Sequence, residues 1–186
     1  MSKTALLIID VQKGFDTEPD YWGKRNNPQA EENMARLLAE WRKHNRPVIH
    51  IQHISDNPKS PLRPGQLGNE IKDEVAPQPN EPLFTKTVNS AFIGTNLEDH
   101  LKENRIESLV IVGLTTDHCV STTTRMAANL GFNVTLISDG TATFDRTYAG
   151  KHYSAEQMHQ LHLASLDGEF CTVITTQEVI AKNTNS

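Results

Sequence analysis

Gly113-Leu114-Thr115-Thr116-Asp117-His118-Cys119-Val120 is the stretch of sequence that decides the fold. It follows the apolar run 109–112 and opens a helical stretch that closes at Gly131. Because the run is short, β-branched and bounded by glycine, we interpret it as a buried strand and place the Cys119 thiol on the strand-to-helix turn. The positive end of the helix dipole favours a thiolate there, and so a nucleophile. The alternative is a buried, inert cysteine, which is common in proteins.

The composition is that of an ordinary globular chain with a small acidic excess. A length of 186 residues suffices for one well-buried core, so we expect a single domain over 1–186. The net charge of −5 and the lack of a basic cluster argue against nucleic-acid binding. Cys119 and Cys171 form no CxxC pair, no apolar run has membrane-spanning length, and the chain opens with a strand instead of a signal peptide. We therefore expect a cytoplasmic protein without a membrane partner.

Strand-like runs alternate with helical ones along the chain. The predicted strands are 5–9, 48–51, 109–112, 134–137 and 171–174, with a weaker one at 82–85. Short, uniformly apolar strands separated by helices indicate a parallel sheet that is covered on both faces. The sequence thus predicts an α/β fold, a three-layer Rossmann-like sandwich.

Capping residues mark where several helices begin. Asn27-Pro28 has the pattern of an N-cap followed by proline at the first helical position. Thr95 with Glu98, and Ser154 with Gln157, have the spacing of capping boxes.

The segment from about 53 to 81 differs from the rest because it is rich in proline and has little apolar periodicity. A loop of this length inside a compact domain is usually functional or disordered. We interpret it as a semi-rigid lid or a subunit contact. Arg63 in this loop is a candidate to meet a substrate carboxylate, from the same or a neighbouring subunit.

Three chemically active side chains follow predicted strands. Asp10 ends the first strand, Lys86 follows the run 82–85, and Cys119 lies just past the run 109–112. Ligands of open parallel sheets bind at the carboxyl ends of the strands, so the three groups form a candidate activated nucleophile. Taken singly, Asp10 fits a strand-end cap and Lys86 a solvated charge. The spacing alone does not show that the three side chains meet.

Four ordered blocks resemble the isochorismatase-like cysteine hydrolase family, which includes nicotinamidases, N-carbamoylsarcosine amidohydrolases and ureidoacrylate hydrolases. The blocks are Asp10-Val11-Gln12 with Phe15, Lys86 with Ser90-Ala91-Phe92, Gly113 to Val120 with Thr124-Arg125-Met126-Ala127, and Asp139-Gly140-Thr141-Ala142-Thr143-Phe144. The resemblance covers nearly the whole chain. It implies six parallel strands in the order 3-2-1-4-5-6 and a homodimer or homotetramer.

The resemblance also implies a reaction. Asp10, Lys86 and Cys119 would form the catalytic triad, and a cis peptide between Leu114 and Thr115 would aim the amides of Thr115 and Cys119 at one oxyanion position. Isochorismatases that cleave a vinyl ether lack the cysteine, so we expect hydrolysis of a C–N bond in a small amide, ureido or carbamoyl compound through a thioester. C–O cleavage of the isochorismatase type, or a non-catalytic small-molecule-binding module, are the alternatives.

The metal-binding pattern of nicotinamidases is not matched. On our alignment His53 and Ser55 stand where those enzymes carry an aspartate and a histidine. A single imidazole is a poor divalent-metal site, so we predict no catalytic metal and no cofactor. His53 is then a hydrogen-bonding wall of the pocket or an ordinary loop histidine.

Other residues in or near the motifs are candidates for substrate contact. We expect Trp22 and Phe92 to wall the pocket, Gln12 and Asn89 to orient the substrate or Lys86, and Leu114 to contact the substrate. His118, His159 and His162 are interpreted as surface or interface residues.

Overall fold

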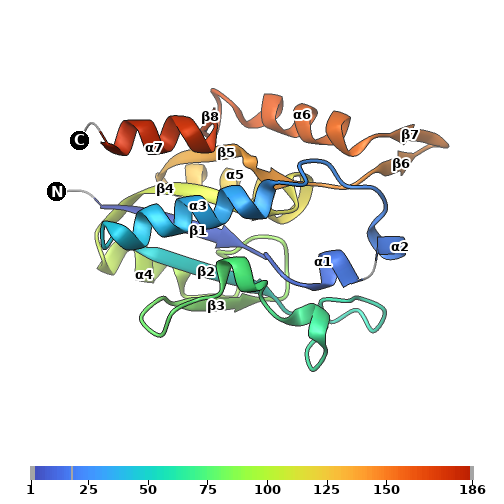
Figure 1. Cartoon of the computed structure of the whole chain (residues 1–186), viewed down its shortest axis with the longest axis horizontal. Helices are drawn as coiled ribbons and strands as arrows, with labels where there is room; N and C mark the ends of the chain where they lie inside the picture. The colour runs from blue at the N-terminus through green and yellow to red at the C-terminus, as the bar shows by residue number, and fades with distance from the viewer. Residues whose placement is uncertain (1–2, 18, 185–186) are drawn as a thin grey trace.

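A six-stranded parallel sheet forms the centre of the molecule (Figure 1). The computed structural model describes residues 3–17 and 19–184. Its strands are β1 (Lys3–Ile9), β2 (Val48–His53), β3 (Leu83–Lys86), β4 (Ile106–Leu114), β5 (Asn133–Ala142) and β8 (Thr172–Ile174). They lie in the order β3-β2-β1-β4-β5-β8, with parallel pairing throughout. The predicted order of six strands is confirmed, β8 being the sixth strand of this sheet.

Helices cover both faces of the sheet, as the apolar strands predict. On one face lie α3 (Ala30–Lys43) and α7 (Thr176–Thr184), and on the other α4 (Leu97–Glu103), α5 (Ser121–Asn129) and α6 (Ala155–Leu166). Figure 1 shows α3 in front of the sheet and α4 and α5 behind it. Within β1, Leu6 and Ile8 pack on the α3 side while Leu7 and Ile9 pack on the opposite side, and all four are buried. This alternation is the period of two expected of a strand with two apolar faces.

The ends of β1 and β4 approach closely because Gly113 has no side chain. Gly113 pairs with Ile9, and a Cβ on Gly113 would lie 2.1 Å from the Ile9 carbonyl oxygen. Its φ of +132° is also one that side chains disfavour. The glycine therefore allows the residues that follow these two strands to meet.

The helix starts confirm one prediction and correct two. Ser154 and Gln157 form a complete capping box at α6. At α4 the N-cap is Asn96, and the Thr95 hydroxyl donates to the Ala91 carbonyl and accepts from the Leu97 amide. At α3 the N-cap is Gln29.

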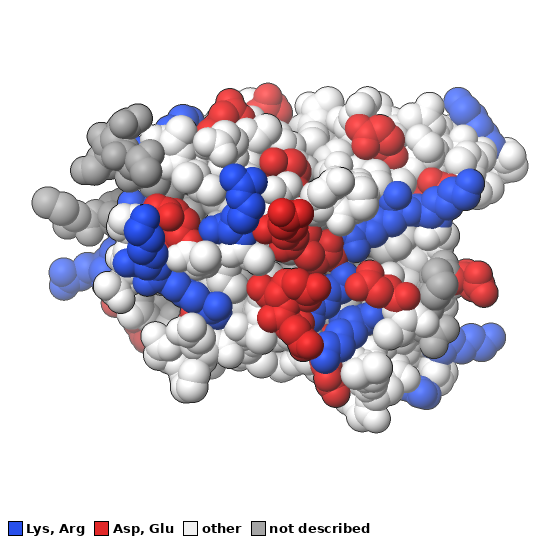
Figure 2. Space-filling model, viewed as in Figure 1, with Lys and Arg blue, Asp and Glu red and all other residues white. Residues whose placement is uncertain are grey.

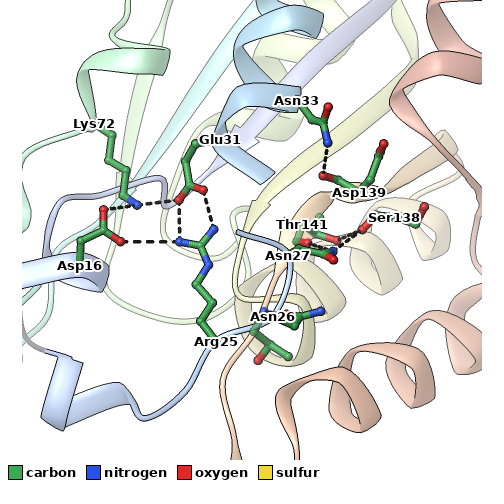
Figure 3. Close-up of polar contacts among 11 residues, drawn as sticks. Asp16, Arg25, Asn26, Asn27, Glu31, Asn33, Lys72, Ser138, Asp139 and Thr141 are labelled. Atoms are coloured by element: carbon green, nitrogen blue, oxygen red, sulfur yellow. Dashed lines mark hydrogen bonds and ion pairs between the residues drawn. The ribbon is translucent and has the colours of Figure 1, made fainter. Parts of the chain in front are cut away.

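Asn27 does not cap α3 because its amide is used elsewhere. It donates to the carbonyl oxygens of Ser138 (3.0 Å) and Thr141 (2.8 Å), as Figure 3 shows. The residue thereby ties the segment before α3 to the end of β5.

The proline-rich segment is a structured loop with two 3₁₀ turns, η1 (Leu67–Asn69) and η2 (Asp73–Val75). The Asn69 amide donates to the carbonyl oxygens of His53 and Leu62, and the backbone amide of Lys72 donates to Val11. Val75 is fully buried against the α3 face. The loop is thus fastened beside the carboxyl ends of the strands.

Three short elements near this edge were not predicted. They are α1 (Gly14–Thr17), α2 (Pro19–Trp22) and the antiparallel hairpin of β6 (Arg146–Tyr148) and β7 (Lys151–Tyr153). Acidic and basic side chains are interleaved on the face shown in Figure 2. Among the described residues, no helix is both long and apolar enough to cross a membrane.

Candidate active site

Asp10, Lys86 and Cys119 meet at the carboxyl edge of the sheet. Lys86 is the last residue of β3, Asp10 directly follows β1, and Cys119 lies in the turn η3 (Thr116–Val120) after β4. The Lys86 Nζ atom lies 2.7 Å from Asp10 Oδ2 and 3.3 Å from Cys119 Sγ. Asp10 and Lys86 are 1 % and 2 % exposed, so their charges interact with little screening by water. The readings of Asp10 as a simple cap and of Lys86 as a solvated charge do not fit this geometry.

The backbone around these residues turns sharply. Asp10 has a φ of 52°, and its amide donates to the Ile51 carbonyl of the neighbouring strand β2. The peptide bond between Leu114 and Thr115 is cis. The carbonyl of Thr115 then accepts from the amides of His118 and Val120, which closes the η3 turn below Cys119.

The surroundings of Cys119 favour the thiol over the thiolate. Burial raises the pKa of Cys119 well above its ordinary value, the charge of Asp10 raises it further, and Lys86 opposes both. The expectation of a thiolate stabilised by the helix dipole was therefore wrong for the free protein. That expectation considered the helix end and left out the burial and the carboxylate.

A cavity of about 180 Å³ opens at this cluster. Trp22 and Asn89 line it as predicted, together with Thr115 and Cys119. The other lining residues are Asp10, Phe15, Tyr21, His53, Ser55, Ser60 and Leu62. Ser60 and Leu62 come from the proline-rich loop, so this loop contributes to the cavity of its own chain.

One wall of the cavity is aromatic. The rings of Phe15 and Trp22 lie 4.6 Å apart between centroids, and those of Tyr21 and Trp22 lie 4.7 Å apart. The Trp22 indole N–H donates to the Gly14 carbonyl at 2.8 Å, which fixes the ring on α1. The sequence gives a local signal for this wall in the adjacent Tyr21-Trp22 pair, but nothing in it shows that Tyr21, Ser60 and Leu62 meet.

His53 lies on the cavity wall beside the ammonium group. Its Nδ1 atom is 3.2 Å from Lys86 Nζ, and burial followed by the charge of Lys86 lowers its pKa. Ligand atoms of Asp10, His53 and Cys119 lie within 4.8 Å of one another, a spacing that a metal ion could use. Lys86 Nζ contacts an atom of each, however, so an ion would compete with the ammonium for this position. The absence of a catalytic metal stays a prediction.

Three of the predicted substrate contacts do not line the cavity. Gln12 is fully buried, and its amide accepts from the His53 amide while donating to the carbonyls of His53 and Asn69. Phe92 packs in the core, with its ring 6.0 Å from that of Phe132. Leu114 is fully buried in the core on the α3 side. Gln12 instead positions the backbone of His53, a role that its place next to Asp10 did not reveal.

Two other predictions need correction. His159 is 4 % exposed, and its Nδ1 lies 2.8 Å from the Thr116 hydroxyl, because α6 packs over the η3 turn. It is therefore no surface residue. Arg63 is exposed, and its guanidinium donates to Pro58 and Gln66 within its own loop. It does not line the cavity of its own chain, so contact with a neighbouring subunit stays a prediction.

Four charged side chains, Asp16, Arg25, Glu31 and Lys72, form a closed ring of ion pairs (Figure 3). Arg25 makes a bidentate pair with Glu31 at 2.8 and 2.5 Å. The Lys72 ammonium lies 2.6 Å from both Glu31 and Asp16, and Arg25 lies 3.6 Å from Asp16. We call this group the charge ring. It joins α1, which carries Phe15, to α3 and to the proline-rich loop.

The protein has a parallel α/β sheet with a thiol, a carboxylate and an ammonium close together at its strand ends. This combination is typical of a Rossmann-like hydrolase. Residues 4–178 match the isochorismatase domain, and the chain belongs to the isochorismatase family of hydrolases. It is 52 % identical to the isochorismatase family protein YrdC of Bacillus subtilis (strain 168), over 96 % of this chain and 95 % of that protein.

Two further comparisons extend the likeness to structure and to an enzyme of named activity. A crystal structure of an isochorismatase family protein from Chromobacterium violaceum superposes with a TM-score of 0.94 at 46 % identity, covering 99 % of this chain and 95 % of that one. The ureidoacrylate amidohydrolase RutB of Agrobacterium fabrum is 27 % identical over 75 % of this chain and 76 % of that enzyme.

Proposed function

We propose that this family member is a cysteine-dependent hydrolase that cleaves a C–N bond of a small amide, ureido or carbamoyl compound. The contact of one ammonium, Lys86 Nζ, with both Asp10 and Cys119 carries the proposal. It puts a nucleophile, a proton acceptor and a balancing charge beside one cavity. The likeness to an amidohydrolase supports the C–N assignment.

In the proposed first step Asp10 accepts the proton of the Cys119 thiol, and the sulfur attacks the carbonyl carbon. Because burial and the charge of Asp10 raise the pKa of Cys119, we expect this transfer to accompany the attack instead of preceding it. The negative charge that forms on the carbonyl oxygen is stabilised by the backbone amides of Thr115 and Cys119, two residues that line the cavity. Asp10 then gives the proton to the leaving nitrogen, and the C–N bond breaks to leave a thioester.

In the second step water attacks the thioester. Asp10 takes a proton from the water and returns one to the sulfur as the C–S bond breaks, which releases the acid and restores the thiol. Throughout, Lys86 balances the charge of Asp10 and of any thiolate that forms. The cycle requires no metal or cofactor.

The experiment is an assay of ammonia release from a panel of amides, ureides and carbamoyl compounds. Cys119→Ala should abolish release and keep the native fold by circular dichroism. Cys171→Ala is the matched control, because Cys171 is a buried core cysteine remote from the cavity lining, and it should retain activity. Activity near that of the wild type in Cys119→Ala would refute the proposal.

The alternatives give different results in the same experiment. Cleavage of isochorismate without ammonia release would indicate C–O hydrolysis. Ligand binding without Cys119-dependent turnover would indicate a binding module. We also propose a cytoplasmic homodimer or homotetramer acting on a small molecule, and light scattering of the purified protein measures that assembly.

A further inference from the structure

We infer that the cavity selects an uncharged compound in which the reacting carbonyl is attached to a flat apolar group, and that it rejects compounds carrying a carboxylate close to that carbonyl. This inference rests on the proposed function and names the class of substrate. It follows from three features of the cavity: the balance of its charges, the nature of its walls and one buried oxygen without a partner.

The charges at the bottom of the cavity already balance. The Lys86 ammonium has three N–H groups, and it has three neighbours within bonding distance: Asp10 Oδ2, His53 Nδ1 and Cys119 Sγ. No donor of Lys86 is left for a substrate carboxylate. Among the described residues that line the cavity there is no arginine and no lysine.

The two cations of the charge ring, which is joined to the aromatic wall through α1, are also occupied. Arg25 is paired with Glu31, and Lys72 is paired with Glu31 and Asp16 in the charge ring. An anionic group in the cavity would thus lose its water without gaining a countercharge. That loss is costly for a carboxylate and small for a neutral group.

The walls suit a flat apolar group of modest size. Phe15, Tyr21, Trp22 and Leu62 supply the apolar surface, and Ser55, Ser60 and Asn89 supply uncharged polar groups. A volume of about 180 Å³ lies below the roughly 300 Å³ at which pockets for drug-sized ligands begin. A single ring with its amide is therefore the scale of ligand that the cavity accepts.

One buried oxygen indicates how the amide is oriented. Asp10 is one of the residues that line the cavity, and its Oδ1 atom is buried without a hydrogen-bond partner among the described residues. A buried acceptor without a partner is costly, and an N–H of the substrate's amide or ureide would satisfy it. The leaving nitrogen is then held next to the group proposed to protonate it.

The test uses three benzamides of nearly the same shape: 3-nitrobenzamide, 3-carbamoylbenzoate and 3-amidinobenzamide. They carry a neutral, a negative and a positive planar substituent beside the amide. Their binding to the Cys119→Ala protein is measured by calorimetry, since the substituents would change the rate of turnover for electronic reasons. We expect the nitro compound to bind at least about tenfold more tightly than the carboxylate, because the cavity offers the anion no partner. The amidinium should also bind more weakly than the nitro compound, because Asp10 is already neutralised by Lys86.

Binding of the carboxylate as tight as that of the nitro compound would overturn the inference, and so would the failure of all three to bind. Either result differs from a failure of the proposed function, which is judged by Cys119-dependent ammonia release in the wild-type protein.

A second arm adds a cation to the wall. Tyr21 is 45 % exposed and tolerates substitution better than the buried wall residues. Tyr21→Lys should reduce the preference for the nitro compound over the carboxylate by at least about threefold. This is the size of effect expected of an ion pair between partly exposed groups. Tyr21→Met is the matched control and should leave the preference unchanged. An equal preference in both variants would show that charge in this cavity does not set the selectivity.

Discussion

Asp10 and Lys86, which we call the strand-end pair, and the charge ring are both ion-pair clusters beside the same cavity. They are built in different ways. Asp10 and Lys86 have side chains exposed by 1 % and 0 %, and each is the other's ion-pair partner. In the charge ring Glu31 contacts two cations and Asp16 is 59 % exposed. The strand-end pair therefore depends wholly on both members, whereas the ring retains contacts when one member is lost. This difference suits a pair that we propose takes part in the chemistry and a ring that holds the aromatic wall in place.

The largest difference between the two clusters is expected in the variant Lys86→Met. It leaves the buried Asp10 carboxylate without a countercharge, which should destabilise the protein by about 3–5 kcal/mol and abolish turnover. Urea denaturation measures the first effect and ammonia release the second. Lys13→Met is the control, because Lys13 pairs with Glu70 and Asp73 at the surface, and its loss should leave stability unchanged.

If Lys86→Met does not fold, a double variant still tests the pair. Asp10→Asn with Lys86→Met removes both charges, so it should recover most of the lost stability without recovering turnover. A single variant as stable as the wild type would show that the two charges are not coupled.

The next prediction separates the roles of Asp10. Its negative charge raises the pKa of Cys119, so Asp10→Asn should lower that pKa and speed alkylation of Cys119 by iodoacetamide at pH 8, while turnover is lost. Asp99→Asn, at an exposed acid of α4, should change neither rate.

Cys171 provides an internal reference in the same measurement. Burial raises its pKa to about 12, so its alkylation should stay slow in every variant. Slower alkylation of Cys119 in Asp10→Asn would contradict the electrostatic explanation.

The strand-end pair could be predicted from the sequence, and the charge ring could not. The strands β1 and β4 contain continuous apolar runs, and parallel strands bring their carboxyl ends to one edge, so Asp10, Lys86 and Cys119 are found by position and family motif. The four ring residues come from α1, an irregular segment, α3 and the proline-rich loop. Pairing across such segments leaves no pattern in the sequence.

The wrong predictions have a common physical cause. Gln12, Phe92 and Leu114 lie within the motifs, but neighbours in a strand or turn point in different directions, and these three point into the protein. The raised pKa of Cys119 was missed for a related reason: the burial that raises it depends on the loops that close over a strand end. Position along a strand was predictable, while the direction and surroundings of side chains depended on tertiary packing.

Loss of one member of the charge ring is expected to cost less stability than loss of Lys86, and to weaken substrate binding more than catalysis. Lys72→Met removes one side of the ring, and Glu31 keeps its bidentate pair with Arg25. We expect a loss of about 1–3 kcal/mol from hydrogen bonds to charged groups, and a rise in KM that exceeds any change in kcat, because the aromatic wall is loosened while the strand-end cluster is intact. Lys72→Arg should restore KM. A fall in kcat at constant KM would assign the ring to the chemistry instead.

The smallest expected effect is a change in the acid stability of the ring. Burial alone would raise the pKa of Glu31, but hydrogen bonds and charges from Arg25 and Lys72 outweigh it, and the pKa lies below its ordinary value of 4.5. Glu31 thus contributes stability that is present above pH 4.5 and is lost as the pH falls through its lower folded pKa. In Glu31→Gln the free energy of unfolding should decline less steeply below pH 4.5, whereas Glu103→Gln, at an exposed acid of α4, should follow the wild type. Protonation of Glu31 leaves Asp10 paired with Lys86. If KM rises at acid pH in the wild type but not in Glu31→Gln, the charge ring and not the strand-end pair is the cause of that rise.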